Sequence, residues 1–337
     1  MLPICGRMEI DMISDTRVVA IGGGTGLSTM LKGLKLHTHN ITAVVTVADD
    51  GGSSGMLRTD LGMLAPGDVR NCVSALAEVD PVMGELLNFR FKGGSLKGHS
   101  LGNLFLAALN ETSSSFDEAV KKFCHLTGVV GTVYPVTNEA VTLSALLEDG
   151  TVIEGESNIG VHHDDHNSPI ARLMINPEKP KAVDGVIKAI ERADIIVLGP
   201  GSLYTSIIPN LLVDGVVDAI RQSKAVKIYV CNIMSQGGET ENYTASDHLA
   251  AIERHSYEGI ADIVIANNAI IPEGLKKKYA EEHAYEVEID ANKILKRSKL
   301  VQGNLLLVRN DKIRHNFSRL ARTIMRLGSD INYFEKQ

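Results

Sequence analysis

The chain has 337 residues, 44% of them hydrophobic, and a formal net charge of −7. This length suits one large α/β domain or two smaller ones, and the acidic balance argues against sequence-independent nucleic-acid binding, which depends on Lys and Arg. No apolar run is long enough to span a bilayer, and the four cysteines match no metal-binding pattern, so we expect a protein of the reducing cytoplasm.

The N-terminal stretch 1–16 lacks the basic start and apolar centre of a secretion signal. We expect it to be a poorly ordered leader. Residues 17–330 are expected to form a single domain, with a helical insert at about 57–127 and a β appendage at about 129–175.

The domain begins with a strand–helix–strand pattern. The β-branched run 18–21 predicts a buried parallel strand and leads into the loop Gly22–Gly26. Apolar residues at helical spacing over 27–36 predict a helix, and 41–48 predicts a second strand that leads into the loop Asp49–Gly55. Glycine-rich loops before helices let backbone N–H groups approach a phosphate, so both loops predict an anionic ligand.

The next stretch, 57–125, predicts mainly helices, which we expect to cover a cleft. Asp68 follows Pro66-Gly67, where it either joins an acidic site or caps a helix. His99 stands among small polar residues just before a helix. It is either an acid/base group or phosphate ligand, or a packing histidine.

A change of pattern follows at 129–175. The segments 142–147 and 151–155, joined by Asp149-Gly150, predict a β-hairpin, and 171–175 predicts another strand. The cluster His162–His166 resembles a metal site, but consecutive ligands cannot easily converge on one ion. We interpret this cluster as a solvated loop.

The α/β pattern then resumes. It predicts strands at 195–198, 227–231 and 263–266, helices at 183–192, 207–222 and 246–255 with Ser246 as N-cap, short strands near 286–289 and 305–308, and a final helix near 318–327. The loop Gly199–Ser206, Asn232 and Asn267 follow the three main strands of this half. The loop precedes a helix and is a third anion site by the same logic.

All five main strands end in glycine or small polar residues. Because the carboxyl ends of parallel strands lie at one edge of a sheet, their loops should line a single cleft. The sequence therefore predicts an α/β, Rossmann-like, mainly parallel sheet with helices on both faces and a small antiparallel β appendage.

The individual loops leave alternatives open. The first loop has Leu27 where the dinucleotide fingerprint needs its third glycine, so its glycines either bind phosphate or make a tight turn. Asp49 and Asp50 could hold Mg²⁺ or accept a hydrogen bond from a ribose hydroxyl, or belong to a solvated turn. Arg314 could reach a second phosphate or lie on the surface. A Gly-x-Ser-x-Gly elbow does not occur in the sequence, which argues against a serine hydrolase.

The candidate site residues follow from these loops. The catalytic candidates are Asp50, Asp68 and His99, and Asp49, Asp50 and Asp68 are the candidate ligands if Mg²⁺ binds. The candidate ligand-binding residues are Gly22, Gly23, Gly24, Thr25, Gly26, Asp49, Asp50, Gly51, Gly52, Ser53, Asn71, His99, Asn103, Gly199, Pro200, Gly201, Ser202, Thr205, Ser206, Asn232, Asn267 and Arg314.

Five of these motifs in this order, Gly22–Gly26, Asp49–Gly55, Pro66–Asn71, Gly98–Asn103 and Gly199–Ser206, resemble the YvcK family of gluconeogenesis factors in the CofD-like superfamily. The resemblance covers about residues 17–327. It implies a Rossmann-like fold, a cytoplasmic location, a role in cell shape and cell-wall synthesis during gluconeogenic growth, and binding of UDP-N-acetylglucosamine. Arg314 matches a family arginine implicated in that binding. Asn316 and Phe317 stand where some relatives carry a phosphorylated threonine, so that regulation is not expected here.

The CofD enzymes of the superfamily imply a different activity. They transfer phospholactate from a guanosine diphosphate carrier with Mg²⁺, and the Gly199–Ser206 loop is similar to their phosphate loop only in outline. We expect a nucleotide-sugar-binding regulator with no required cofactor, and keep an Mg²⁺-dependent transferase and an NAD(P)-binding enzyme as alternatives. The expected partners are a nucleotide sugar or dinucleotide, a protein of cell-wall metabolism and, in a homo-oligomer, further copies of this chain.

Overall fold

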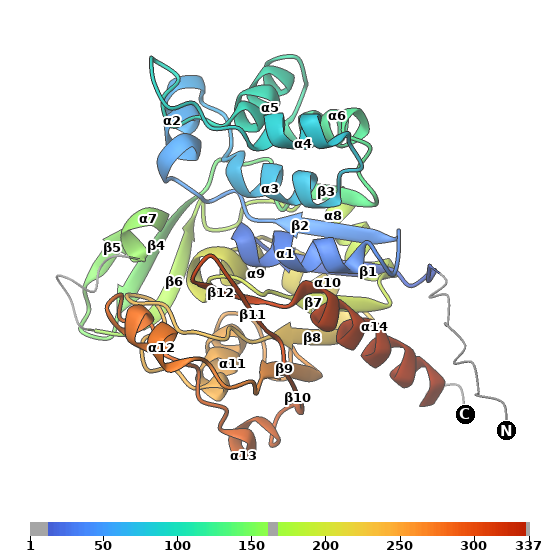
Figure 1. The fold of residues 1–337 in the computed structure, drawn as a ribbon, viewed down its shortest axis with the longest axis vertical. Coiled ribbons are helices and arrows are strands. Elements are labelled where there is room, and N and C mark those ends of the chain that lie inside the picture. The colour runs from blue at the N-terminus through green and yellow to red at the C-terminus, as the bar shows by residue number, and fades with distance from the viewer. Residues whose placement is uncertain (1–12, 161–167, 335–337) are drawn as a thin grey trace, which may run out of the picture.

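The computed structural model describes residues 13–160 and 168–334, with side chains through residue 329. Its centre is a seven-stranded parallel sheet in the order β10-β9-β8-β7-β1-β2-β3, flanked by helices (Figure 1). The strands are β1 (Val18–Gly22), β2 (Ile41–Val45), β3 (Thr132–Pro135), β7 (Ile195–Leu198), β8 (Val226–Val230), β9 (Ile263–Asn267) and β10 (Lys299–Gly303). This arrangement confirms the predicted Rossmann-like α/β fold.

The order in which successive strands are added to the sheet reverses at its centre. β1 pairs with β2 on one side and with β7 on the other, so that Val18 lies opposite both Ile41 and Ile195. Every residue of β1 is buried, as expected for a strand whose sheet is covered on both faces. The chain builds outward from β1 to β3 in one direction and from β7 to β10 in the other. This is a topological switch point, where open α/β sheets bind ligands.

Helices follow most of the strands. They are α1 (Gly24–Leu34), α2 (Gly52–Leu61), α3 (Gly67–Leu76), α4 (Pro81–Asn88), α5 (Leu101–Glu111), α6 (Phe116–Leu126), α7 (Glu156–Ile159), α8 (Asp184–Arg192), α9 (Ile208–Leu211), α10 (Val216–Gln222), α11 (Ala245–Arg254), α12 (Glu273–Ala280), α13 (Ala291–Ile294) and α14 (Phe317–Phe334). A π-helical turn spans Leu203–Ile207. α1 lies against both α3 and α14, which holds the glycine-rich start of α1 at the sheet edge (Figure 1).

Two small antiparallel sheets complete the fold. β5 (Val152–Glu154), β4 (Thr142–Leu147) and β6 (Ile170–Asn176) form a three-stranded sheet, which confirms the predicted hairpin and the strand near 171–175. β11 (Leu306–Arg309) and β12 (Lys312–His315) form a hairpin, of which the sequence predicted only the first strand. β12 brings Arg314 back to the central sheet, as described below.

Several local predictions were wrong. The N-cap of α11 is Thr244, whose hydroxyl accepts a hydrogen bond from Asp247 N, whereas Ser246 donates its hydroxyl to Asp290. The segment 207–222 does contain the helix predicted within it, α10, which begins after Gly215, whose φ of +85° favours glycine. Residues 286–289, all described, form no strand and contribute only a single bridge to Met234. Short segments of this kind depend on neighbours that are distant in the sequence.

Three parts of the structure bear on the remaining predictions. The cluster His162–His166 lies outside the described residues, as does most of the expected leader, although Ser14 N donates to His37 O. No helix in the described part of the chain is both long and apolar enough to cross a membrane.

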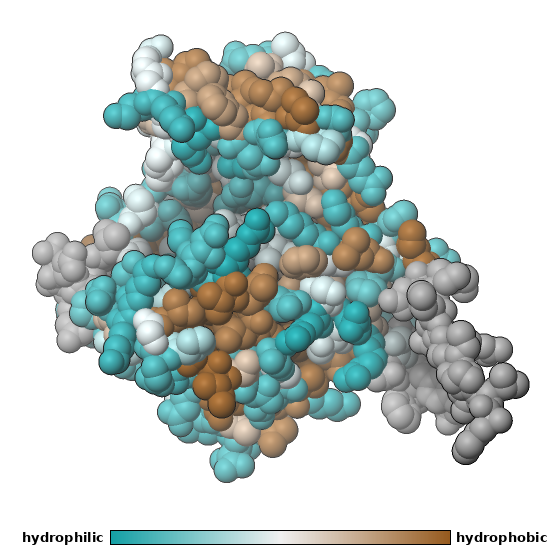
Figure 2. All heavy atoms as spheres, viewed as in Figure 1, coloured by the Kyte–Doolittle hydropathy of each residue, from teal (hydrophilic) through white to brown (hydrophobic). Residues whose placement is uncertain are grey.

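Exposed apolar side chains gather on and beside α4, namely Val82, Met83, Leu86 and Phe89, in the brown area at the top of Figure 2.

Candidate functional site

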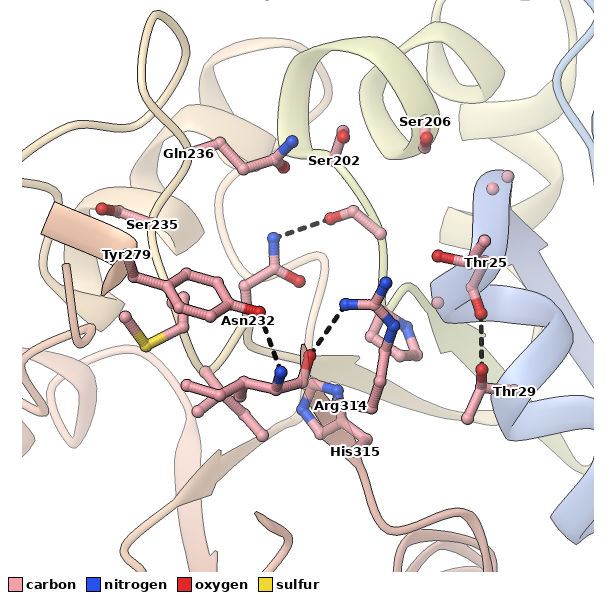
Figure 3. Close-up of a pocket in the computed structure, with 18 residues that line it drawn as sticks. Thr25, Thr29, Ser202, Ser206, Asn232, Ser235, Gln236, Tyr279, Arg314 and His315 are labelled. Carbon is pink, nitrogen blue, oxygen red and sulfur yellow. Dashed lines mark hydrogen bonds between the residues drawn. The ribbon is translucent and has the colours of Figure 1, made fainter. Parts of the chain in front are cut away.

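A pocket of about 320 Å³ opens at the switch point, beside the carboxyl ends of β1, β7 and β8. We call it the switch-point pocket. Its lining residues, drawn in Figure 3, are Gly23, Gly24, Thr25, Gly26, Thr29, Pro200, Gly201, Ser202, Ser206, Asn232, Ile233, Met234, Ser235, Gln236, Tyr279, Ile313, Arg314 and His315. The loops after β1 and β7 thus face one space, as the position of the switch point requires.

The two glycine loops touch through their backbones. A Cβ atom on Gly26 would lie 2.5 Å from the carbonyl oxygen of Pro200, so only glycine fits this approach. Asn232 fixes the second loop, because its Nδ2 donates to Gly201 O at 2.8 Å. The N-cap residue of α1 is Gly23, which has no side chain to cap the helix, and the carboxylate of Asp68 accepts from Gly24 N in its place. The N–H groups of Thr25 and Gly26, which also line the pocket, have no acceptor inside their helix.

The hairpin β11–β12 closes the opposite side of the pocket. Figure 3 shows the Arg314 guanidinium between Asn232 and Thr25, and its Nη1 donates to Ile313 O at 2.8 Å. Within the described chain Arg314 forms no ion pair, so its charge is available to an anion. Tyr279 OH accepts from Ile313 N at 2.8 Å and holds the strand in place. Burial lowers the pKa of His315 to about 4, so this histidine is neutral at pH 7 and donates to Cys231 O.

A second, smaller hollow of about 200 Å³ lies beyond the carboxyl end of β2. We call it the arginine hollow. It is lined by Asp49, Gly51, Gly52, Ser53, Ser54, Gly67, Asp68, Arg70, Asn71, Arg90 and Asn103. His99 lies behind this wall rather than in it, with Nδ1 3.1 Å from Ser53 Oγ. Asn103 Nδ2 donates to the same hydroxyl at 3.0 Å, so His99 and Asn103 both fix Ser53.

The switch-point pocket and the arginine hollow meet at Gly23. A Cβ atom on Gly23 would lie 2.6 Å from Asp68 Oδ2 and 3.3 Å from Ser206 Cβ. Burial, and then the charge of Asp49, raise the pKa of Asp68 to about 6. Asp68 does not cap its own helix, because the N-cap position of α3 is Pro66. It lines the arginine hollow instead, and its Oδ2 lies beside Gly23, which lines the switch-point pocket.

Asp50 lines neither of the two spaces, and its carboxylate is held by the backbone of another element. Its two carboxylate oxygens accept from Glu156 N at 2.9 Å and from Ser157 N at 2.8 Å, which places it at the start of α7. The interaction spans more than a hundred residues of sequence, so the local pattern of two aspartates and a glycine–serine loop could not reveal it. The carboxylate of Asp50 therefore serves the appendage that carries α7.

Other predicted ligand-binding residues also lie outside the two spaces. Asn267 Nδ2 donates to Ala269 O, and its Oδ1 accepts from Leu305 N, so the side chain ties β9 to the segment before β11. Thr205 donates its hydroxyl to Glu239. Gly22 and Gly199 end their strands, and the φ of +77° at Gly199 lets the chain turn into the pocket.

The structure adds residues that the sequence analysis did not assign. Arg70, Arg90, Tyr279 and the segment 233–236 line the two spaces but belong to no glycine-rich loop. Of these residues, Arg70 alone could have been found from the sequence, because it belongs to the motif Pro66–Asn71. The others come from segments whose place at the sheet edge depends on tertiary packing.

Two glutamates near the site have raised pKa values, the buried Glu239 and the half-buried Glu156. Glu239 is 5% exposed and accepts from Tyr204 N at 3.2 Å, and burial raises its pKa to about 7. Burial, and then the charges of Asp49 and Glu239, raise the pKa of Glu156 to about 8. Carboxyl groups buried this close together cannot all ionise without a cost in stability.

We expect the free energy of unfolding to fall as the pH rises from about 4.5 to 8. Both glutamates have a pKa above the ordinary glutamate value of 4.5, so the folded protein binds more protons than the unfolded chain in this window. Glu239→Gln should reduce this pH-dependent loss of unfolding free energy by about 3 kcal/mol, because each unit of pKa shift corresponds to about 1.36 kcal/mol. Urea denaturation at pH 5, 6, 7 and 8 measures this, with the exposed Glu273→Gln as control. Equal slopes for Glu239→Gln and the wild type would contradict it.

Comparisons with known proteins agree with the motifs. Residues 18–306 match the family described as 2-phospho-L-lactate transferase CofD. A relative from Thermoanaerobacterium thermosulfurigenes is 52% identical over 94% of this chain and 98% of its own length. The gluconeogenesis factor of Bacillus subtilis is 42% identical over 92% of this chain and 98% of its own length. A crystal structure of a Bacillus halodurans member of the UPF0052 family is 44% identical, with a TM-score of 0.89 over 92% of this chain and 100% of that chain.

Proposed function

This chain belongs to the CofD family, among relatives named gluconeogenesis factors, and on that premise we propose that it is a regulator that binds a nucleotide sugar such as UDP-N-acetylglucosamine. The ligand would favour one conformation through its differential affinity, and so control a protein partner in cell-wall metabolism. In this role the protein would support cell shape during gluconeogenic growth in the cytoplasm.

The switch-point pocket supports a diphosphate-containing ligand. Its floor combines the backbone of Thr25 and Gly26 at the start of α1, the backbone of Gly201 and the Ser202 hydroxyl with the Arg314 guanidinium on the opposite side. Backbone N–H groups at a helix start and a guanidinium are the donors that phosphate oxygens prefer. The diphosphate would therefore lie between the backbone of Thr25 and Gly26 and the guanidinium of Arg314.

The far end of the pocket is apolar and aromatic. Ile233, Met234 and Tyr279 line it, next to the amide of Gln236. An aromatic ring offers a stacking surface for a planar base, and a side-chain amide offers a donor and an acceptor for its edge. This end fits the base of a nucleotide.

One observation favours regulation over catalysis. Two of the three catalytic candidates, Asp50 and His99, are engaged in hydrogen bonds that fix α7 and Ser53. Asp68 is engaged as well, because its carboxylate accepts from Gly24 N and from the side chain of Asn71, so each of the three candidates already holds part of the fold. We therefore prefer a binding role.

A second candidate function is an Mg²⁺-dependent transfer. Asp49 and Asp68 lie close enough for the charge of one to raise the pKa of the other, and a divalent cation would relieve that repulsion. Mg²⁺ binds to one or two carboxylates together with substrate phosphates, so these two residues fit it, whereas Asp50 does not. The ion would supply charge neutralisation at a leaving phosphate.

Isothermal titration with UDP-N-acetylglucosamine, GDP and NAD, each with and without Mg²⁺, tests the proposal. We expect binding of the UDP-sugar that is independent of Mg²⁺, without turnover. A preference for GDP that requires Mg²⁺ would overturn it in favour of transfer chemistry. A preference for NAD would favour the dinucleotide alternative.

A further inference from the structure

The arginine hollow contains a buried cation that is held by neutral groups. Arg70 is only 7% exposed, although it carries a guanidinium. Its Nε donates to Asn103 Oδ1 at 3.3 Å and its Nη1 to Asn88 Oδ1 at 2.9 Å. In residues 13–160 and 168–329, Arg70 forms no ion pair, and Asp68 offsets its charge only from a distance. Buried charges are rarely left without a compensating anion.

A second arginine adds to this charge. Arg90, exposed beside α4, lines the same hollow and donates to Gly98 O. Burial, and then the charge of Arg90, lower the pKa of Arg70. Arg90 likewise forms no ion pair with any residue that the structure describes. Two guanidinium groups at one small hollow repel each other unless an anion lies between them.

Backbone donors face the hollow from the other side. The first intrahelical hydrogen bond of α2 runs from Gly55 N to Gly51 O. The N–H groups of Gly52, Ser53 and Ser54 therefore have no acceptor inside their helix. A Cβ atom on Gly52 would meet nothing within 4 Å, so the space above this helix start is open.

We propose that the arginine hollow binds the phosphate group of a small second ligand, held between Arg70, Arg90 and the start of α2. The volume of about 200 Å³ suits a phosphate with a short substituent rather than a whole nucleotide. This inference goes beyond the proposed nucleotide-sugar site and does not depend on which nucleotide binds there. It makes the crevice a site for two ligands that meet at Gly23 and Asp68.

The two carboxylates that line the hollow predict which anions it prefers. Asp49 and Asp68 both line the hollow, Asp68 on its side toward Gly23, and an ionised carboxylate only accepts hydrogen bonds. A phosphate that still carries a proton can donate to such a carboxylate, whereas sulfate at neutral pH has no proton to donate. We therefore expect inorganic phosphate to bind more tightly than sulfate.

Equilibrium dialysis of the full chain with inorganic phosphate, in chloride buffer without nucleotide, tests the inference. Arg90→Gln should weaken phosphate binding roughly tenfold, since a hydrogen bond to a charged group contributes about 1.5 kcal/mol or more. Arg90 is exposed, so this variant should fold normally. The matched control is Arg326→Gln, which removes the same charge from an exposed position of α14, at the other end of Figure 1 from α2, and should bind as the wild type does.

Four results would overturn the inference. The first is that phosphate does not bind, and the second is that Arg90→Gln binds it as tightly as the wild type. The third is that UDP-N-acetylglucosamine displaces phosphate while Arg90→Gln leaves its affinity unchanged. The fourth is that phosphate binds only with Mg²⁺ and with the same affinity in Arg90→Gln. The third would place the phosphate in the switch-point pocket, and the fourth would assign it to Asp49 and Asp68. UDP-N-acetylglucosamine is added only in a separate competition experiment. The comparison of Arg90→Gln with the wild type uses no nucleotide, so failure of the nucleotide-sugar proposal leaves that comparison unchanged.

Discussion

Arg314→Ala is expected to weaken binding of UDP-N-acetylglucosamine about 30-fold and to leave the fold intact. Arg314 is the one cation among the residues that line the described switch-point pocket. Removing a charge-assisted hydrogen bond to a diphosphate costs about 2 kcal/mol. Its own intramolecular contact is a bond from Nη1 to the neighbouring Ile313 O, so little of the fold depends on the side chain. Isothermal titration of both proteins measures the change.

The matched control for this substitution lies on the same hairpin. Arg309 is exposed on β11, opposite Lys312, and does not line the pocket. Arg309→Ala therefore removes the same charge at a short distance from the ligand. We expect it to bind the UDP-sugar as the wild type does. Equal losses of affinity in both variants would show that only the overall positive charge of the hairpin matters.

Gly26→Ala is expected to abolish nucleotide binding and to lower the free energy of unfolding by about 2 kcal/mol. The added methyl group would lie 2.5 Å from Pro200 O and 2.8 Å from Pro200 C, and neither backbone atom can turn away as a side chain can. The two loops must separate, and overpacking of this kind costs roughly 1–3 kcal/mol. Titration with the UDP-sugar and urea denaturation give the two numbers.

Gly274→Ala provides the comparison for this prediction. Gly274 lies in the first turn of α12, where a Cβ atom would meet nothing within 4 Å. Alanine favours the helix by up to about 1 kcal/mol over glycine, so this variant should be neutral or slightly stabilised and should bind normally. Wild-type binding by Gly26→Ala would refute the backbone contact between the two loops.

The sequence by itself determined the α/β architecture and the main loops that approach the ligand. β-branched runs such as 18–21 and 195–198 are readable because a strand buried on both faces is apolar along its whole length. Glycines directly after such runs, at Gly22–Gly26 and Gly199–Gly201, mark places where backbone must approach backbone or ligand. Both signals are local, so one chain is enough to detect them.

Only the tertiary structure decided which polar residues face a ligand. Asp50 and Asp49 are adjacent in sequence, but Asp50 is bound to the start of α7 while Asp49 lines the arginine hollow. Asn267 likewise follows a main strand and yet bonds to Leu305 N. The direction of a polar side chain depends on which distant backbone groups lack partners once the chain has folded, and no local pattern records those groups.

The same reason explains the residues that sequence analysis missed. Arg90 and Tyr279 reach the crevice from segments with no glycine-rich signal, because the packing of α4 and of the β11–β12 hairpin brings them there. The single cleft expected from five strand ends is two spaces, with Asp68 beside Gly23 between them. Sequence periodicity therefore fixed the sheet edge at which the candidate site lies, and long-range packing divided that edge into two spaces.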